Sequence, residues 1–187
     1  MNELDKKLIK TLDYYYRPRK AVKLIKKGAN PNVITDDGRN TTPLMIAVYN
    51  NDISFVKFLI DAGADVNTRG DYMTQLGLTV FLKACRTGNK KIMNLIKEAG
   101  ADIHDTCKNG ANGILHASAK NLNIIRYLKD MGLDIHARDH KGQNALMYAF
   151  THAEYTRDSY DVYKSELIQT LIDFGIDLNE KDNRGQT

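Results

Sequence analysis

Apolar residues recur along this chain at the spacing of short, paired helices. In the segment TPLMIAVYNNDISFVKFLIDAGADVN, which begins at Thr42, the apolar residues Ala47 and Val48 follow Leu44 by three and four residues. That spacing predicts a short helix with one buried face. Thr42 is a suitable N-cap, and Pro43 then occupies the first helical position, where its missing N–H costs nothing. The polar run NND ends this helix, and a second one follows. The residues expected on its buried side are Ile53, Val56, Leu59 and Ile60.

A glycine follows the second helix, and it returns along the chain in similar phrases such as LIDAGADVN and IKEAGADIH. Glycine suits this place because helices often end in a left-handed conformation, which glycine adopts without a Cβ clash. An Asp or Asn two residues later can bond to nearby backbone and begin a turn. Successive copies lie 32 to 43 residues apart, which indicates a stacked array of repeats with insertions. The repeated glycines are Gly28, Gly63, Gly100, Gly132 and Gly175.

Other glycine-bearing turns, DDGR, QLGL, KNGA and HKGQ, precede the first helices. An extended stretch between two turns predicts a hairpin-like finger, so each unit should consist of a finger, a helix, a loop and a helix. We expect one domain, residues 1–187, of about five units. The expected boundaries are an N-terminal cap at 1–35, units at 36–69, 70–106, 107–138 and 139–181, and the start of a truncated sixth unit at 182–187.

The first-helix segments TPLMIAV, GILHASA and NALMYAF resemble the ankyrin signature T-P-L-H-x-A, and the GADVN phrases resemble the end of an ankyrin repeat. The resemblance extends from about residue 3 to residue 187. It implies an all-α repeat fold, an ankyrin-type solenoid of about five stacked helix-loop-helix units with short β-hairpin-like fingers. Only His116 keeps the signature histidine, which in that family ties neighbouring repeats together by hydrogen bonds. At the other steps packing must replace this link, because the equivalent residues are Met45, Leu82 and Met147.

The two ends of the array differ from its middle. The first unit should act as a cap, with an apolar stripe beneath a lysine-rich outer side. The stripe consists of Leu4, Leu8, Leu12 and Tyr15. At the other end, EKDNRGQT is a finger without helices, so part of the preceding apolar face is expected to be uncovered unless the chain is a fragment or another molecule covers it. That face consists of Leu167, Ile168, Leu171 and Ile172.

The fifth unit carries about ten extra residues within THAEYTRDSYDVYKS (151–165). Two interpretations are open for this insertion. It can extend the second helix by a turn or two, with Tyr155, Tyr160 and Tyr163 packed on their own repeat. Alternatively, it forms a projection whose tyrosines bind a partner.

Composition and charge narrow the class of protein. With 42% hydrophobic and 27% charged residues the chain is typical of a folded protein, and no apolar run is long enough to span a bilayer. A charged start without an apolar core argues against a secretory signal, and two cysteines imply no disulfide framework. We therefore expect a cytoplasmic protein, or an effector exported without a classical signal peptide. Residues 1–27 carry nine Lys or Arg against three acids, which is either a footprint for an acidic partner or nucleic acid, or one solvated face.

No set of residues points to catalysis. His104 and His136 end two repeat phrases, where turn-forming hydrogen bonds explain them better than a metal does. Cys85 lies among small residues of a first helix and is expected in the core, whereas Cys107 precedes a turn and is expected to be accessible. Neither a phosphate loop nor a paired-carboxylate site is present. We predict no enzymatic activity, cofactor, metal or small-molecule substrate.

We predict instead a non-catalytic, monomeric scaffold that binds a protein partner on a concave face made by the fingers and first helices. The alternatives are binding of nucleic acid, which we disfavour, or of an acidic surface through the basic first unit, and the ankyrin part of a larger effector or enzyme. In the third finger, DYMTQLGL places four large apolar side chains in a protruding loop, which either contact a partner or fold back on adjacent fingers. The finger candidates are Asp37, Arg39, Tyr72, Met73, Leu76, Leu78, Lys108, Asn109, His140 and Lys141. The candidates at the ends of first helices are Tyr49, Asn50, Arg86, Thr87, Lys120, Asn121 and His152.

Overall fold

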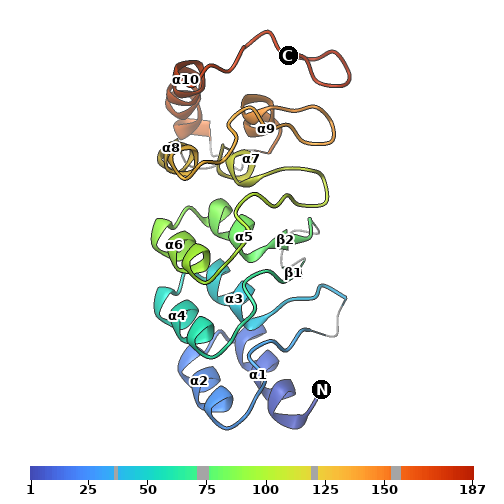
Figure 1. Cartoon of the computed structure of the whole chain (residues 1–187), viewed down its shortest axis with the longest axis vertical. Coiled ribbons are helices and arrows are strands. Elements are labelled where there is room, and N and C mark those ends of the chain that lie inside the picture. The colour runs from blue at the N-terminus through green and yellow to red at the C-terminus, as the bar shows by residue number, and fades with distance from the viewer. Residues whose placement is uncertain (36–37, 71–75, 119–121, 153–156) are drawn as a thin grey trace. The chain divides into compact units, whose positions relative to one another are not determined.

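The computed structural model describes residues 1–35, 38–70, 76–118, 122–152 and 157–187. Contacts within the chain divide it into two compact units, Met1–Asp102 and Ile103–Thr187. Each unit is built from pairs of helices (Figure 1). The organisation of residues 1–187 as one domain stays a prediction.

In the first unit the helices are α1 (Glu3–Asp13), α2 (Pro18–Lys26), α3 (Pro43–Tyr49), α4 (Ile53–Asp61), α5 (Val80–Thr87) and α6 (Lys90–Glu98). The first helix of each pair lies in one row and the second helix in another (Figure 1). Helix α3 packs against both α1 and α5, and α4 packs against both α2 and α6. The core therefore lies between successive pairs, as expected for a repeat array.

Helix α3 has the predicted buried face and more. Leu44, Ala47 and Val48 are fully buried, which confirms the prediction from their spacing. Met45 and Ile46 are buried as well, because α3 has a helix on either side and another behind it. A pattern with one apolar face therefore predicts too few buried residues for a helix in the middle of this array. On α4, Val56 and Leu59 are buried as predicted, whereas Ile53 and Ile60 are only half-buried. Phe55, which was not predicted, is buried too.

Polar side chains begin the first helices at equivalent places. In the first unit the hydroxyl of Thr42 accepts a hydrogen bond from the backbone N–H of Met45, and that of Thr79 accepts one from Leu82. In the second unit the Asn112 and Asn144 side chains accept the equivalent bonds. Each cap satisfies a backbone donor that the helix itself leaves unpaired, and Pro43 follows Thr42 at the first helical position as predicted.

The predicted glycine ends the second helices. Gly63 has a φ of +84°, and the backbone N–H groups of Gly63 and Ala64 return to the carbonyls of Ile60 and Leu59. These two bonds satisfy carbonyls at the helix end and turn the chain out of the helix.

The fingers are closed by short backbone ladders. In the third repeat, strands β1 (Arg69–Gly70) and β2 (Leu78–Thr79) pair antiparallel, with Gly70 opposite Leu78. In the second unit, Asp139 and Asp182 each donate a backbone hydrogen bond to the carbonyl four residues on, at Gln143 and Gln186. These ladders agree with the hairpin-like fingers that the turns predict.

In the second unit the helices are α7 (Gly113–Ser118), α8 (Leu122–Asp130), α9 (Ala145–His152) and α10 (Arg157–Asp173). Helix α7 packs on α8 and α9, and α10 packs on α8 and α9. The second helix of the fifth repeat is 17 residues long, against 9 in α8. Residues 157–165 of the insertion thus extend α10, as the first interpretation expects for the helix. Tyr155 and the side chains of Tyr160 and Tyr163 lie outside the description, so their packing stays a prediction.

The predicted apolar stripe of the first unit is wrong at one residue, Tyr15. Leu8 and Leu12 are buried and Leu4 is half-buried, but Tyr15 is 59% exposed. The helical spacing does not reach Tyr15, because α1 ends at Asp13 and the chain turns there. At the other end, Leu167 and Leu171 are buried, Ile168 is half-buried and Ile172 is 42% exposed. The equivalent residues of inner repeats, Lys97 and Lys129, are exposed as well, so an uncovered face there stays a prediction.

Candidate functional site

Two predicted contact residues occupy equivalent positions on neighbouring helices of the first unit. Tyr49 ends α3, and Arg86 lies in the last turn of α5, seven residues after the respective caps Thr42 and Thr79. Helices α3 and α5 pack directly against each other. Since the axes of packed helices lie about 10 Å apart, Tyr49 and Arg86 are neighbours on this surface. Tyr49 is 45% exposed and Arg86 is half-buried.

The next position on each of these helices is polar and tied to its own helix. The Asn50 side chain donates a hydrogen bond to the Ile46 carbonyl, and the Thr87 hydroxyl donates one to the Ala84 carbonyl. Both residues remain exposed. They satisfy carbonyls at the helix ends and leave an accessible polar rim beside Tyr49 and Arg86.

The sequence did not point to Lys83, which lies against Tyr49. Its residue is only 2% exposed, and its ammonium lies 5.8 Å from the centroid of the Tyr49 ring. At this distance the ring attracts the cation. From sequence alone, a lysine in a helix is expected to face solvent. The contact between Lys83 and Tyr49 can be seen only once α5 is packed against α3.

The fingers of the first unit are only partly as predicted. Arg39 is exposed and Leu76 is half-buried. Leu78 is fully buried, so the prediction that it protrudes is wrong. It lies in β2, directly before α5, and therefore belongs to the base of the finger and folds back into the core.

In the second unit, three predicted finger residues are exposed: Lys108, His140 and Lys141. Asn109 has a structural part, because its side-chain oxygen accepts hydrogen bonds from the Cys107 thiol and the Ala111 N–H. The Asn109 carbonyl also accepts a hydrogen bond from the His140 N–H at 2.7 Å. The structure thus brings these two fingers together at their tips.

The remaining candidates lie outside the description. Asp37, Tyr72, Met73, Lys120 and Asn121 are not among the described residues, and for His152 only the backbone position at the end of α9 is described.

The expected accessibility of Cys107 is wrong. The residue is 4% exposed, and its sulfur lies 3.3 Å from Nε2 of the buried His116. Cys107 belongs to the base of a finger, where its N–H bonds to the Ala111 carbonyl, and this turn points the thiol inward. Cys85 is buried as predicted, and its burial raises the pKa of the thiol far above its ordinary value.

The histidines at the repeat bends do not converge on a metal site. Within the described residues no group of three His, Cys, Asp or Glu side chains could hold a metal ion. His136 lies beside Gly175, and its own N–H bonds to the Asp134 carboxylate in the turn that the sequence predicts.

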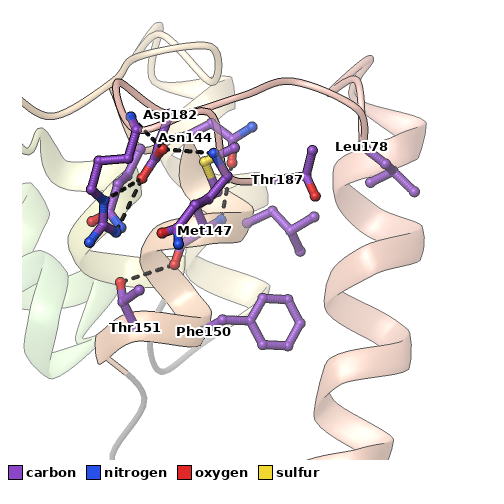
Figure 2. A pocket seen from close by; sticks show the side chains of 11 residues that line it. Asn144, Met147, Phe150, Thr151, Leu178, Asp182 and Thr187 are labelled. Atoms are coloured by element: carbon purple, nitrogen blue, oxygen red, sulfur yellow. Dashed lines mark hydrogen bonds and ion pairs between the residues drawn. The ribbon is translucent and has the colours of Figure 1, made fainter. Parts of the chain in front are cut away.

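The second unit has a hollow of about 210 Å³ between α9 and the last finger (Figure 2). Its walls include the apolar side chains of Met147, Phe150 and Leu178. The Asp182 carboxylate at its edge is occupied, because it accepts hydrogen bonds from the backbone N–H groups of Arg184 and Gln186. The Gln186 bond is the main cause that lowers the pKa of Asp182, and the Arg184 guanidinium adds to it. This hollow offers apolar contact, and the aspartate in its lining is held by the turn around it.

Comparison with known families covers nearly all of this architecture. The family described as "Ankyrin repeats (3 copies)" matches residues 14–107 and 84–182. The chain belongs to the ankyrin repeat family. This confirms the all-α repeat fold and the ankyrin resemblance of the helix and turn phrases.

Individual relatives carry the same name. An ankyrin repeat protein of Acanthamoeba polyphaga mimivirus is 30% identical over 125 residues, which cover 64% of this chain and 75% of the relative. One from Borreliella burgdorferi is 37% identical over 68 residues, which cover 36% of this chain and 29% of the relative. The rat protein "Ankyrin repeat and SAM domain-containing protein 6" is 33% identical over 79 residues, which cover 42% of this chain but only 8% of that protein.

Family membership carries a general function. Ankyrin repeats are generally non-catalytic modules of protein–protein interaction. No helix in the described part of this ankyrin chain is both long and apolar enough to cross a membrane.

Proposed function

We propose that this ankyrin chain is a non-catalytic scaffold that binds a protein partner through its fingers and the last turns of its first helices, on the concave face that these elements form in ankyrin arrays. Tyr49 and Arg86 carry the proposal. They lie at equivalent positions on two helices in contact, and neither is needed to fill the core. Tyrosine and arginine are also the residue types most enriched at the centres of protein interfaces.

The surroundings of Tyr49 make it a pre-organised contact. The Lys83 ammonium lies near its ring, and the rest of α3 is buried, so the side chain is held on a rigid element. A fixed aromatic side chain loses little conformational entropy when a partner covers it.

In the second unit the proposed contacts are Lys108, His140 and Lys141. The hydrogen bond between the backbones of His140 and Asn109 fixes the two finger tips relative to one another. These exposed basic and imidazole groups would complement an acidic or polar surface on the partner.

We also propose that the protein acts in the cytoplasm as a monomer. Both described cysteines are free and buried, which suits a reducing compartment. Light scattering after size exclusion tests the oligomeric state.

The experiment is capture of partners from the native cell with wild-type chain and two charge-reversed variants. Arg86→Glu changes the proposed surface, and Lys57→Glu makes the same charge change on the exposed side of α4, in the row of second helices. We expect Arg86→Glu to weaken capture of the partner by about tenfold or more, and Lys57→Glu to leave it within about twofold. Equal capture by all three proteins, with unchanged melting curves, would reject the proposed surface.

A further inference from the structure

The first repeat has a hollow beside the end of α1, and its lining includes neither Tyr49, nor Arg86, nor a finger residue. It is open to solvent, has a volume of about 460 Å³ and is lined by Met1, Lys6, Ile9, Lys10, Tyr14 and Tyr15. Tyr14 is 76% exposed and Tyr15 is 59% exposed, so both rings face solvent. Large exposed aromatic side chains that gather in one concave place are typical of a binding surface.

The helix pattern explains why these residues meet. Leu8 and Leu12 point into the core, which leaves Lys6 and Lys10, one turn apart, on the outer side of α1. The chain leaves the helix after Asp13, and the next two residues are the tyrosines. Their ring centroids lie 6.4 Å apart at an interplanar angle of 45°.

The following residues hold this corner in place. Tyr16 has a φ of +40°, and its hydroxyl donates a hydrogen bond to the Asp52 carboxylate at 3.0 Å. The Arg17 guanidinium then lies 4.9 Å from the centroid of the Tyr15 ring, so a third cation lies against a ring that lines the hollow. The tyrosine pair is therefore fixed by its neighbours and pre-organised for contact.

The nearby acids do not neutralise this surface. Glu3 pairs with Lys7 at 3.4 Å. The Asp5 carboxylate accepts hydrogen bonds from the backbone N–H groups of Asn2 and Asn30, and its residue is buried. Within the part of the chain that the structure describes, neither Lys6 nor Lys10 forms an ion pair. The lining of the hollow thus combines apolar and aromatic side chains with two lysines and contains no acidic residue.

We propose that this hollow binds a short acidic segment of a partner protein, with one large apolar side chain of that segment inside and carboxylates against Lys6, Lys10 and Arg17. The complementarity of charge selects the acidic segment. The apolar and aromatic lining selects a side chain such as Phe, because burying a large apolar group supplies affinity that exposed ion pairs do not. Three cations around one hollow are too few to track a phosphate backbone, whose binding depends on many simultaneous contacts. This site lies at the end of α1, a first helix, and it shares no residue with the contacts proposed above.

The test is fluorescence anisotropy with a labelled peptide of Asp and Glu residues around a single Phe, measured with the full chain at about 0.15 M salt. We expect Lys6→Glu with Lys10→Glu to weaken binding at least about tenfold, and Tyr14→Ala to weaken it about fivefold. A matched control, Arg19→Glu with Lys23→Glu, places the same charge change at the same spacing on the exposed side of α2, away from the hollow. It should bind within about twofold of the wild type.

Further probes separate this site from other partners of a basic surface. A peptide with Ala in place of Phe should bind at least about fivefold more weakly, while oligothymidine and phosphatidylserine vesicles should bind more weakly than the Phe peptide. Equal losses in the α1 and α2 double variants would mean that net charge alone attracts the peptide, and would overturn the site. Tighter binding of oligothymidine or of vesicles than of the peptide would overturn the acidic segment as its occupant.

Discussion

The side-chain oxygen of Asn32 accepts a hydrogen bond at 2.7 Å from the backbone N–H of Asp65, one repeat further along the chain. The Asn32 amide also donates to the Gly63 carbonyl at 2.8 Å. Asn67 repeats the arrangement with Asp102 and Gly100, at 3.0 and 3.2 Å. One asparagine thus fixes the bend of the next repeat by using both ends of its amide group. This explains why the bend phrase favours Asn, whose side chain offers a donor and an acceptor together.

Replacing one such residue should loosen the first unit. We expect Asn67→Ala to lower the free energy of unfolding by about 1 kcal/mol, because two hydrogen bonds are lost and water can reach both partners. Urea unfolding followed by circular dichroism measures the change. Asn123→Ala, on the exposed side of α8, is the control and should lie within about 0.5 kcal/mol of the wild type. An unchanged midpoint for Asn67→Ala would show that the bends are held by packing alone.

One of the two histidines that replace this asparagine in the second unit offers the reverse test. His136 lies beside Gly175, where Asn32 meets Gly63, but no hydrogen bond joins its ring to another described residue. We expect His136→Asn to restore the link to the following bend and to raise the free energy of unfolding by up to about 1 kcal/mol. Thermal unfolding should show a higher midpoint. A lower midpoint would mean that packing of the imidazole on Gly175 matters more than the missing hydrogen bonds.

Gly142 and Gly185 have nearly the same φ angle, so alanine at each position allows the cost of backbone strain to be compared with the cost of a steric clash. Gly142 has a φ of +76° and Gly185 a φ of +79°. A Cβ on Gly142 would lie 2.5 Å from the Asn183 side-chain oxygen and 3.0 Å from its backbone nitrogen, whereas a Cβ on Gly185 would meet nothing within 4 Å. We expect Gly185→Ala to cost about 1 kcal/mol of strain and Gly142→Ala about 2 kcal/mol more, because adjacent fingers must move apart. Urea midpoints that fall equally in both variants would contradict this close approach.

The periodic features of the chain were predictable because they depend on local chemistry. Pro43 after Thr42 marks a helix start, and Gly63 marks a helix end, wherever the rest of the chain lies. Leu78 and Cys107 could not be placed in the same way. Both belong to finger bases, and their burial depends on backbone pairing within the finger, at β1–β2 and between Cys107 and Ala111.

The candidate surfaces show the same division. The positions of Tyr49 and Arg86 at the ends of first helices follow from counting along the repeat, since the caps fix where each helix begins. The hollow beside α1 does not follow from counting, because Tyr15 leaves the helical pattern at the turn after Asp13. A difference of two residues in where a helix ends therefore decides whether a tyrosine lies in the core or faces solvent.

The bond between Tyr16 and Asp52 should make stability depend on alkaline pH. Burial, then the hydrogen bond to Asp52 and its charge, raises the pKa of Tyr16 far above its ordinary value. The native state therefore keeps the proton while the unfolded chain loses it above about pH 10, so this contribution is complete below that pH and is lost as the pH rises further. We expect Tyr16→Phe to lower the free energy of unfolding by about 1 kcal/mol at pH 8, and the advantage of the wild type to shrink above about pH 10. Urea titrations across this range measure it, with Tyr14→Phe as a control that should match the wild type at pH 8.

Burial of Cys85 should protect its thiol as long as the first unit is folded. The residue is 1% exposed within α5, and burial raises the pKa of its thiol, so the reactive thiolate is rare in the native state. We expect iodoacetamide at about pH 8 to label Cys85 at least about a hundredfold more slowly in native protein than in denaturant, because labelling then requires unfolding. Mass spectrometry of the digested protein assigns the label to Cys85 or Cys107. Because burial raises the pKa of the Cys85 thiol, the native protein keeps this proton above about pH 9, whereas the unfolded chain loses it. The free energy of unfolding of the wild type should therefore fall, relative to that of Cys85→Ala, as the pH rises above about 9. Rapid labelling of Cys85 in native protein would mean that α5 opens locally without unfolding of its unit.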